Sequence, residues 1–295
     1  LVGASAFAQT KLQIGCTATT DCASAAVAVE DGIFKKNGLD AELILIALNS
    51  NIPAALMSNS LQIGGPTPSV FLQATDGGLD LVAVAGASST AKATADSVAI
   101  VAKAGAPIKT AKDFAGKKVG APGLGAFLHV LFRQWLVQNN VDPKSVSFVE
   151  VTFPTMNDVL KSGAVDAVVT AEPVLSRIIA AGTGTVVANF LADLPEKQPQ
   201  ILYASTRSWA DANPKAIAAF RASIEEAAAI VNRDPDKGRA AISRFTKIPL
   251  DVLKNMKLSV SDPTIAAAQL EWWTGVMKRQ DMLQATPDAK ALIQK

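Results

Sequence analysis

The 295-residue chain is poor in the side chains that build most catalytic and metal centres: it has one histidine, one tyrosine and two cysteines. The histidine and the two cysteines together give three nitrogen or sulfur ligands, fewer than the four of a typical structural zinc site. Gly-x-Ser-x-Gly, a phosphate-binding Walker loop and His-Glu-x-x-His are also missing. We therefore expect no enzyme activity, metal or cofactor. A Cys–His dyad that uses His129 is the one alternative left.

No charge of one sign dominates the chain. Its 28 basic and 26 acidic residues are interspersed and give a formal net charge of +2. No basic stripe indicates nucleic acid, and no Lys/Arg cluster indicates a membrane surface. No apolar run approaches the roughly 18 residues that a membrane-spanning helix needs. The composition is that of a globular protein with no nucleic-acid partner.

The N-terminal segment has the pattern of a secretion signal. Residues 1–8 are apolar and end in Ala6-Phe7-Ala8, which is the small-x-small pattern of a signal-peptidase site. We interpret residues 1–8 as the tail of a signal peptide and Gln9 as the mature start. This predicts an exported, periplasmic protein, and an ordinary apolar N-terminus is the alternative. Cys16 and Cys22 could pair in an oxidising compartment, or they could be two free, buried thiols.

Apolar segments of strand and helix length alternate along the first third of the chain. Helical spacing of apolar residues and a possible cap at Asp21 predict one helix from there to Phe34. Such alternation is typical of mostly parallel sheets with helices on both faces. The fold class is therefore α/β. The strands predicted in this first unit are 11–16, 41–46, 61–63 and 79–85.

A second unit of the same kind begins near residue 97, and the chain is predicted to be helical almost throughout from Asn213 onward. Two α/β units without a flexible linker indicate two lobes that are joined by short crossings. We expect lobe one to hold residues 9–92 and 200–295, and lobe two to hold residues 93–199. Ligands of open α/β sheets sit beyond the carboxyl ends of the strands, here in the cleft between the lobes.

Several segments of the chain resemble one known family when they are taken in order. They are Ala28–Leu39 with its Gly-Ile-Phe-Lys-Lys-Asn-Gly-Leu end, Asp113–Gly120, Gly163–Ala167, Glu172-Pro173 and Asn213-Pro214 before a helix. The chain resembles the nitrate/sulfonate/taurine group of periplasmic solute-binding proteins, which are related to binders of thiamine pyrimidine precursors. The resemblance covers nearly all of the sequence after residue 8.

The resemblance implies a type II periplasmic binding protein fold that closes on its ligand like a hinged clamp. It also implies a monomer that delivers a small molecule to the permease of an ABC importer. Thr170-Ala171 stand before Glu-Pro where the family often has Trp or Tyr, which puts a sulfonate ligand in doubt. The cysteine-rich motif of the fungal pyrimidine synthases in this superfamily is missing. A neutral pyrimidine-type ligand, an enzyme on the same fold and a regulator's effector domain are the alternatives.

The glycine-rich segment before the helix that ends near Asn139 is the strongest candidate for ligand contact. Exposed backbone N–H groups and the partial positive charge of a helix start favour an anion at Gly123, Gly125, Ala126 and Phe127. A glycine turn without a ligand is the alternative. His129, one turn further, is either a donor to that anion or a packed helix residue.

Other candidates follow predicted strands or lie near the crossings. The loop after the first strand contains threonine hydroxyls and one carboxylate. These groups either contact a ligand or only cap the helix that follows. Asp21 and Glu172 would suit an N–H donor on a ligand that is otherwise an organic anion. The candidate residues outside the glycine segment are Thr17, Thr19, Asp21, Gly65, Thr67, Ser88, Phe153, Thr170 and Glu172.

Overall fold

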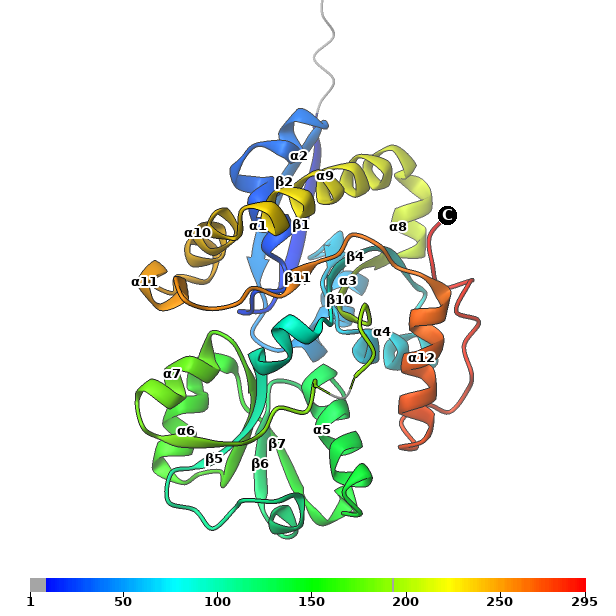
Figure 1. Ribbon diagram of the computed structural model, residues 1–295. Helices are drawn as coiled ribbons and strands as arrows, with labels where there is room; N and C mark the ends of the chain where they lie inside the picture. The colour runs from blue at the N-terminus through cyan, green and yellow to red at the C-terminus, as the bar shows by residue number, and fades with distance from the viewer. Residues whose placement is uncertain (1–8, 193) are drawn as a thin grey trace, which may run out of the picture.

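The computed structural model describes residues 9–192 and 194–295, which form two α/β lobes built on separate sheets (Figure 1). The first sheet has six strands in the order β11-β4-β10-β3-β1-β2. Every residue of β4 is buried, as its run of Val, Ala, Gly and Ser predicts for a central strand. The strands are β1 (Thr10–Cys16), β2 (Leu39–Leu45), β3 (Ile63–Gly64), β4 (Leu81–Ser89), β10 (Pro199–Thr206) and β11 (Val260–Ser261).

The second sheet has five strands in the order β7-β6-β8-β5-β9. They are β5 (Val98–Lys103), β6 (Lys118–Ala121), β7 (Ser147–Glu150), β8 (Ala167–Ala171) and β9 (Gly184–Ala188). In each sheet four strands share one direction. β10 in the first sheet and β5 in the second run antiparallel to both neighbours that flank them. The predicted α/β class with mostly parallel sheets is thus confirmed, and each sheet is mixed.

The strands β5 and β10 are the first strands after the two crossings between the sheets. The first crossing contains the 3-10 helix η2 (Lys92–Ser97), and the second follows β9. Backbone hydrogen bonds from Thr90 N to Gln198 O and from Lys197 N to Thr90 O tie the crossings together. The Asn189 side chain adds a hydrogen bond to Val98 O at 3.0 Å. The crossings therefore form a paired, hydrogen-bonded connection.

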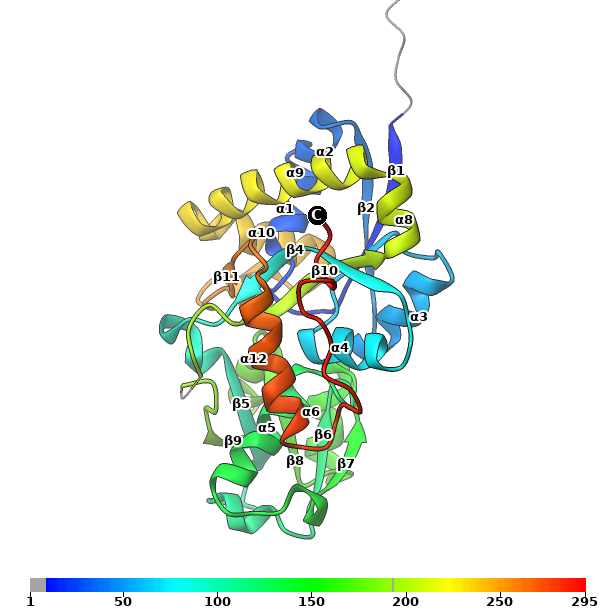
Figure 2. The same cartoon turned by 90° about the vertical axis from the view of Figure 1, so that its right-hand side faces the viewer.

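Helices cover both sheets (Figures 1 and 2). Around the first sheet lie α1 (Ala23–Glu30), α2 (Ile33–Lys36), α3 (Ile52–Met57), α4 (Pro68–Asp76), α8 (Arg207–Ala212), α9 (Pro214–Arg233), α10 (Pro235–Thr246), α11 (Leu250–Leu253) and α12 (Ala267–Lys278). The second sheet has α5 (Phe127–Gln138), α6 (Met156–Ser162) and α7 (Val174–Ala180). Short 3-10 helices are η1 (Asn49–Asn51), η3 (Ala111–Phe114), η4 (Pro143–Ser145) and η5 (Phe153–Thr155).

Two secondary-structure predictions need correction. The single helix expected from Asp21 to Phe34 is two helices, α1 and α2, because Gly32 takes a left-handed φ of 69° between them. The C-terminal region is less helical than predicted, since α12 ends at Lys278. The chain then returns along β4, where Ala83 N donates to Leu292 O and Gln294 N donates to Ala83 O. Backbone hydrogen bonding to β4 thus takes the place of helix at the C-terminus.

One hydrophobic cluster spans the two lobes. It contains side chains of α4 and α12 from the first lobe and of α5 from the second. Trp273 on α12 lies 5.4 Å from the ring of Phe127 on α5, and its indole N–H donates to Pro199 O at 3.2 Å. In Figure 2, α12 runs down from the first lobe in front of the second. In the described part of the chain, no helix has the length and apolar character needed to cross a bilayer.

Candidate ligand-binding site

A cavity lies between the two sheets, where strand ends and helix starts of both lobes meet. Its volume is about 50 Å³. β1, β6 and β8 all end at or next to it, as expected for sheets that place their ligands at strand ends. Its lining consists of Thr17, Thr19, Asp21, Asn49, Thr67, Val98, Pro122, Ala126, Phe127, Leu128, Phe153, Ala171, Gln200 and Ile201. We call this the inner cavity.

The loop after β1 supplies one wall of the inner cavity and is closed by a disulfide. Cys16 and Cys22 are bonded, with Cα atoms 6.5 Å apart, so the alternative of two free thiols is excluded. Within the loop, the Thr19 hydroxyl donates to Asp21 Oδ2 at 2.6 Å, and the Ser88 hydroxyl donates to Asp21 Oδ1 at 2.7 Å. Both carboxylate oxygens are thus held before any ligand arrives. The disulfide and these bonds restrain the loop at the cavity.

Polar contacts also fix the wall formed by Asn49 and Thr67. The Thr67 backbone N–H donates to Asn49 Oδ1 at 2.8 Å, and Asn49 Nδ2 donates to Gly65 O at 3.1 Å. The Thr67 hydroxyl caps α4 by accepting from Val70 N at 3.3 Å. Opposite, Gln200 Nε2 donates to Ser89 O at 3.1 Å. These side chains are all at least nine-tenths buried, so the inner cavity has a rigid polar half.

The start of α5 faces the inner cavity without a cap. Ala126 occupies the N-cap position and has no side chain that could accept from the first turn. In the described chain, the N–H groups of Phe127 and Leu128 have no acceptor, and both residues line the cavity. The lining contains no Lys or Arg side chain, and Asp21 is its one carboxylate. The uncapped helix start is therefore the positive end of the site.

The glycine segment ahead of α5 is arranged differently from the sequence-based expectation. Gly125 N donates to His129 Nδ1 at 2.9 Å, and Leu124 N donates to Glu150 Oε1 at 3.0 Å. Neither Gly123 nor Gly125 lines the inner cavity. Because these N–H groups are already bound within the protein, the available donors lie two residues further, in the first turn of α5. The expected helix-start site is thus shifted from Gly125 to Phe127 and Leu128.

His129 lies outside the inner cavity and accepts a hydrogen bond instead of donating one to an anion. Its ring is 6% exposed and packs edge-on against Phe148, with ring centroids 4.5 Å apart. Burial, with the Arg133 cation second, lowers the His129 pKa from 6.5 to about 3. The imidazole is therefore neutral in the folded protein and supports the glycine segment from behind. Packing is the better of the two roles considered for it.

We expect His129 to make the protein less stable in mild acid. Between about pH 6.5 and about pH 3 the unfolded chain binds a proton at this residue and the folded chain does not. The free energy of unfolding should therefore fall with pH, by about 2 kcal/mol from this residue between pH 7.5 and pH 5. His129→Asn keeps an acceptor for Gly125 but cannot titrate. Urea unfolding should show that much less loss for the variant, and equal losses would contradict the prediction.

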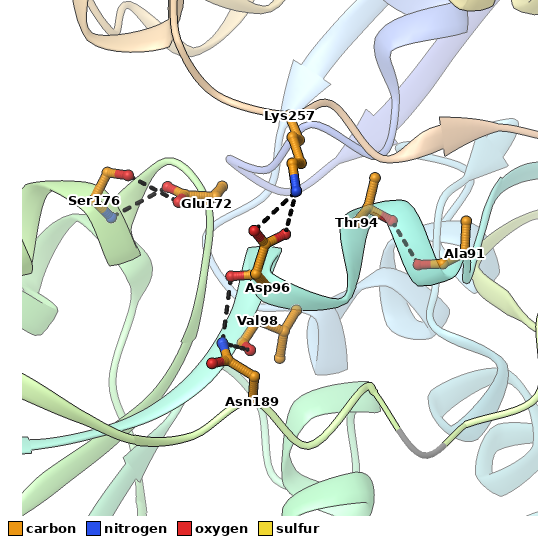
Figure 3. Close-up of polar contacts among 8 residues, drawn as sticks. All are labelled: Ala91, Thr94, Asp96, Val98, Glu172, Ser176, Asn189 and Lys257. Carbon is orange, nitrogen blue, oxygen red and sulfur yellow. Dashed lines mark hydrogen bonds and ion pairs between the residues drawn. The ribbon is translucent and has the colours of Figure 1, made fainter.

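Four further candidates lie around the inner cavity without lining it. Gly65 is behind the wall, where its N–H donates to Gly15 O at 2.8 Å, and Ser88 positions Asp21. Thr170 is fully buried in β8, and its hydroxyl has no partner within the described residues. Glu172 accepts from Ser176 Oγ at 2.8 Å and from Ser176 N at 3.1 Å (Figure 3). This carboxyl is therefore held at the start of α7 and does not line the cavity, and burial raises its pKa.

Figure 3 shows that Glu172 lies beside the first crossing, where Lys257 forms an ion pair with Asp96 at 2.9 Å.

Seven of the expected residues do line the inner cavity: Thr17, Thr19, Asp21, Thr67, Ala126, Phe127 and Phe153. Seven lining residues were not expected from the sequence: Asn49, Val98, Pro122, Leu128, Ala171, Gln200 and Ile201. Gln200 carried the clearest available signal, because it is an amide side chain at the start of a buried strand that directly follows a crossing.

Comparison with known proteins places the chain in a family. A profile of the NMT1-like family matches residues 5–245. The chain belongs to the NMT1-like family. Among curated protein sequences, none matches this NMT1-like protein. The resemblance predicted from the sequence is confirmed at the level of family and fold.

Solved structures share the fold of this NMT1-like protein at low sequence identity. The alkanesulfonate-binding protein SsuA from Xanthomonas axonopodis pv. citri, bound to MOPS, has a TM-score of 0.82 at 16% identity, covering 98% of this chain and 99% of that one. A ligand-binding component of an ABC-type import system from Staphylococcus aureus, with zinc bound, has a TM-score of 0.83 at 17% identity, covering 97% of both chains. The periplasmic nitrate-binding protein NrtA from Synechocystis PCC 6803 has a TM-score of 0.80 at 19% identity, covering 96% and 84%.

Proposed function

We propose that this NMT1-like protein is the extracytoplasmic solute-binding component of an ABC importer, and that it captures a small organic anion. The observation that carries the proposal is the uncapped start of α5, where Phe127 and Leu128 line a cavity between the lobes and their N–H groups have no acceptor among the described residues. The lobe division at residues 92/93 and 199/200 would let this cavity open and close. The chain would bind its ligand without converting it.

Three observations support export and transport. Two of the structural neighbours described above are named for the ligand that they bind, the third is called the ligand-binding component of an ABC-type import system, and the nitrate-binding one is called periplasmic. The Cys16–Cys22 disulfide suits an oxidising compartment. The inner cavity is lined by fixed polar groups and apolar walls but contains no histidine and no free thiol in the described chain. That lining suits binding better than acid–base or nucleophilic chemistry.

The lining also limits the ligand. The start of α5, and that of α4 behind Thr67, favour a sulfonate or carboxylate head group. Phe127 and Phe153 supply apolar surface, which favours an organic anion over nitrate. Asp21 adds a negative charge at the other wall, and it suits an amine or N–H donor on the same ligand. A short aminosulfonate such as taurine meets all three conditions.

Calorimetric titration of the purified protein tests this assignment. Taurine, ethanesulfonate, propanoate, nitrate and 4-aminopyrimidine form a suitable panel. We expect a sulfonate or carboxylate of the panel to bind at least tenfold more tightly than 4-aminopyrimidine, because only an anion gains from the helix starts. The ligand should be recovered unchanged and in stoichiometric amount.

Two results would reject the assignment in different ways. Binding of 4-aminopyrimidine alone would support the alternative of a neutral thiamine-precursor binder. Turnover of any ligand would show an enzyme on the same fold. The titrations would also rank taurine against ethanesulfonate, and a preference for ethanesulfonate would remove the role given to Asp21.

A further inference from the structure

A second and larger cavity adjoins the inner cavity on the side of α7. It has a volume of about 400 Å³, whereas the inner cavity has about 50 Å³. Phe153 lines both cavities, and Ala18, which lines the larger one, lies between the inner-cavity residues Thr17 and Thr19. We call it the outer groove. It lies between α7 of the second lobe and the turn from α10 to α11 of the first lobe.

Apolar side chains from both lobes form the walls of the outer groove. Leu45 and Ile248 come from the first lobe, and Phe153 and Val174 come from the second. Leu45 is 48% exposed at the end of β2, an edge strand of the first sheet. The volume is within the range of roughly 300–1,000 Å³ that is usual for small-molecule sites. The groove can therefore take an apolar segment that continues outward from the inner cavity.

Two cations stand in the outer groove, one from each lobe. Arg177 belongs to α7, and Lys247 directly follows α10. Both are exposed, and neither forms an ion pair or a side-chain hydrogen bond with any residue that the structure describes. Asp251 shares an adjoining cavity with Arg177, but the two are not paired either. Because no carboxylate of the described chain pairs with them and both line the groove, these two cations are available to a ligand.

We propose that the outer groove is a second anion subsite, which takes the far end of an elongated ligand. The ligand would carry one anionic group at the α5 start and a second, beyond an apolar segment, between Arg177 and Lys247. This rests on the proposed function, because it needs an anion in the inner cavity. Charge complementarity and the shared Phe153 wall support it. Bringing the two cations to one anionic group would also hold the lobes together.

The role of these cations can be tested with paired ligands. Linear alkanesulfonates of three to eight carbons are compared by calorimetry with ω-sulfocarboxylates of the same lengths. At the length that reaches the groove, the dianion should bind about fivefold to tenfold more tightly than the monoanion, as two exposed ion pairs allow. The advantage should shrink at about 1 M salt, where exposed charges are screened.

Variants separate the subsite from general electrostatics. Arg177→Gln combined with Lys247→Gln should abolish the advantage of the dianion and change the affinity for the monoanion less than twofold. Arg233→Gln is the control, because Arg233 is an exposed cation in the last turn of α9, away from both cavities. Thermal unfolding of each variant checks that the loss of a cation near a helix end has not changed the fold.

The outcomes distinguish this subsite from the proposed function. If monoanions bind but every dianion binds equally well, the subsite is wrong and the proposed function stands. If the double variant keeps the advantage, the subsite is also wrong. If neither series binds but taurine, ethanesulfonate or propanoate does, the subsite is wrong and the proposed function stands; if none of these anions binds, the proposed function fails and the subsite falls with it. The proposal is supported if the dianion binds more tightly than the monoanion and the double variant Arg177→Gln/Lys247→Gln removes this preference. The control variant Arg233→Gln should keep it.

Discussion

Ala126→Asp should weaken the binding of an organic anion by about a hundredfold while leaving the protein folded. Ala126 is the N-cap of α5 and lines the inner cavity. Its φ and ψ of −78° and 170° are those of a helix cap, so an aspartate there can accept from the first-turn N–H groups that the ligand would use. The added charge also repels the ligand. At ~6 Å and an effective dielectric of about 20, that repulsion is about 2.8 kcal/mol, which corresponds to about a hundredfold loss of affinity.

Stability should change far less than affinity. A cap of this kind typically stabilises a helix by about 1 kcal/mol, which offsets part of the cost of placing a charge in the cavity. Ala266→Asp is the matched control. Ala266 is the N-cap of α12, a helix with the same number of residues as α5, and it lies outside the inner cavity. It should stabilise the protein by a similar amount and leave the affinity unchanged.

Calorimetry with ethanesulfonate and urea unfolding of the three proteins measure both effects. Equal affinities for Ala126→Asp and the wild type would show that the α5 start does not hold the ligand. A loss of affinity in both variants would indicate a long-range charge effect instead. The test is specific because the substitution improves the helix cap while it occupies the proposed anion site.

Local sequence patterns predicted β1, β2, β3 and β4 to within a few residues, because buried apolar runs between turns carry their own boundaries. They missed β11, which lies in the region predicted to be helical. The same logic placed Thr17, Thr19 and Asp21 at the cavity, since they directly follow β1. The helix break at Gly32 was missed because apolar spacing continues through it, and only its left-handed φ interrupts the helix. The non-helical C-terminus was missed because its partner, β4, is about 200 residues away in sequence.

The site depended on long-range contacts that no local pattern encodes. Gln200 reaches the cavity because β10 inserts between β3 and β4, and Asn49 reaches it through hydrogen bonds to Gly65 and Thr67. The glycine segment looked like an anion site because free N–H groups were assumed. In the folded protein, the Gly125 N–H donates a hydrogen bond to the side chain of His129 and is not free. Whether a backbone donor is free can be decided only when its tertiary partners are known.

Trp273→Ala should destabilise the protein more than any substitution considered above, by about 4 kcal/mol. Trp273 is fully buried on α12, and its indole N–H donates to Pro199 O. The ring packs against Phe127 in the first turn of α5, so the substitution leaves a large void between the lobes. Because Phe127 then loses its support, we also expect a several-fold loss of affinity for ethanesulfonate.

Two neighbouring variants make the Trp273 prediction specific. Trp273→Phe keeps most of the packing and loses the hydrogen bond to Pro199, so it should cost only about 1–2 kcal/mol. Trp272→Ala removes the adjacent indole, which is only partly buried, and should cost less than Trp273→Ala. Urea unfolding followed by circular dichroism measures all three, with calorimetry at a temperature where each variant is folded. A loss below about 1 kcal/mol for Trp273→Ala would mean that the cluster joining α12 to α5 does not hold the start of α5 at the inner cavity.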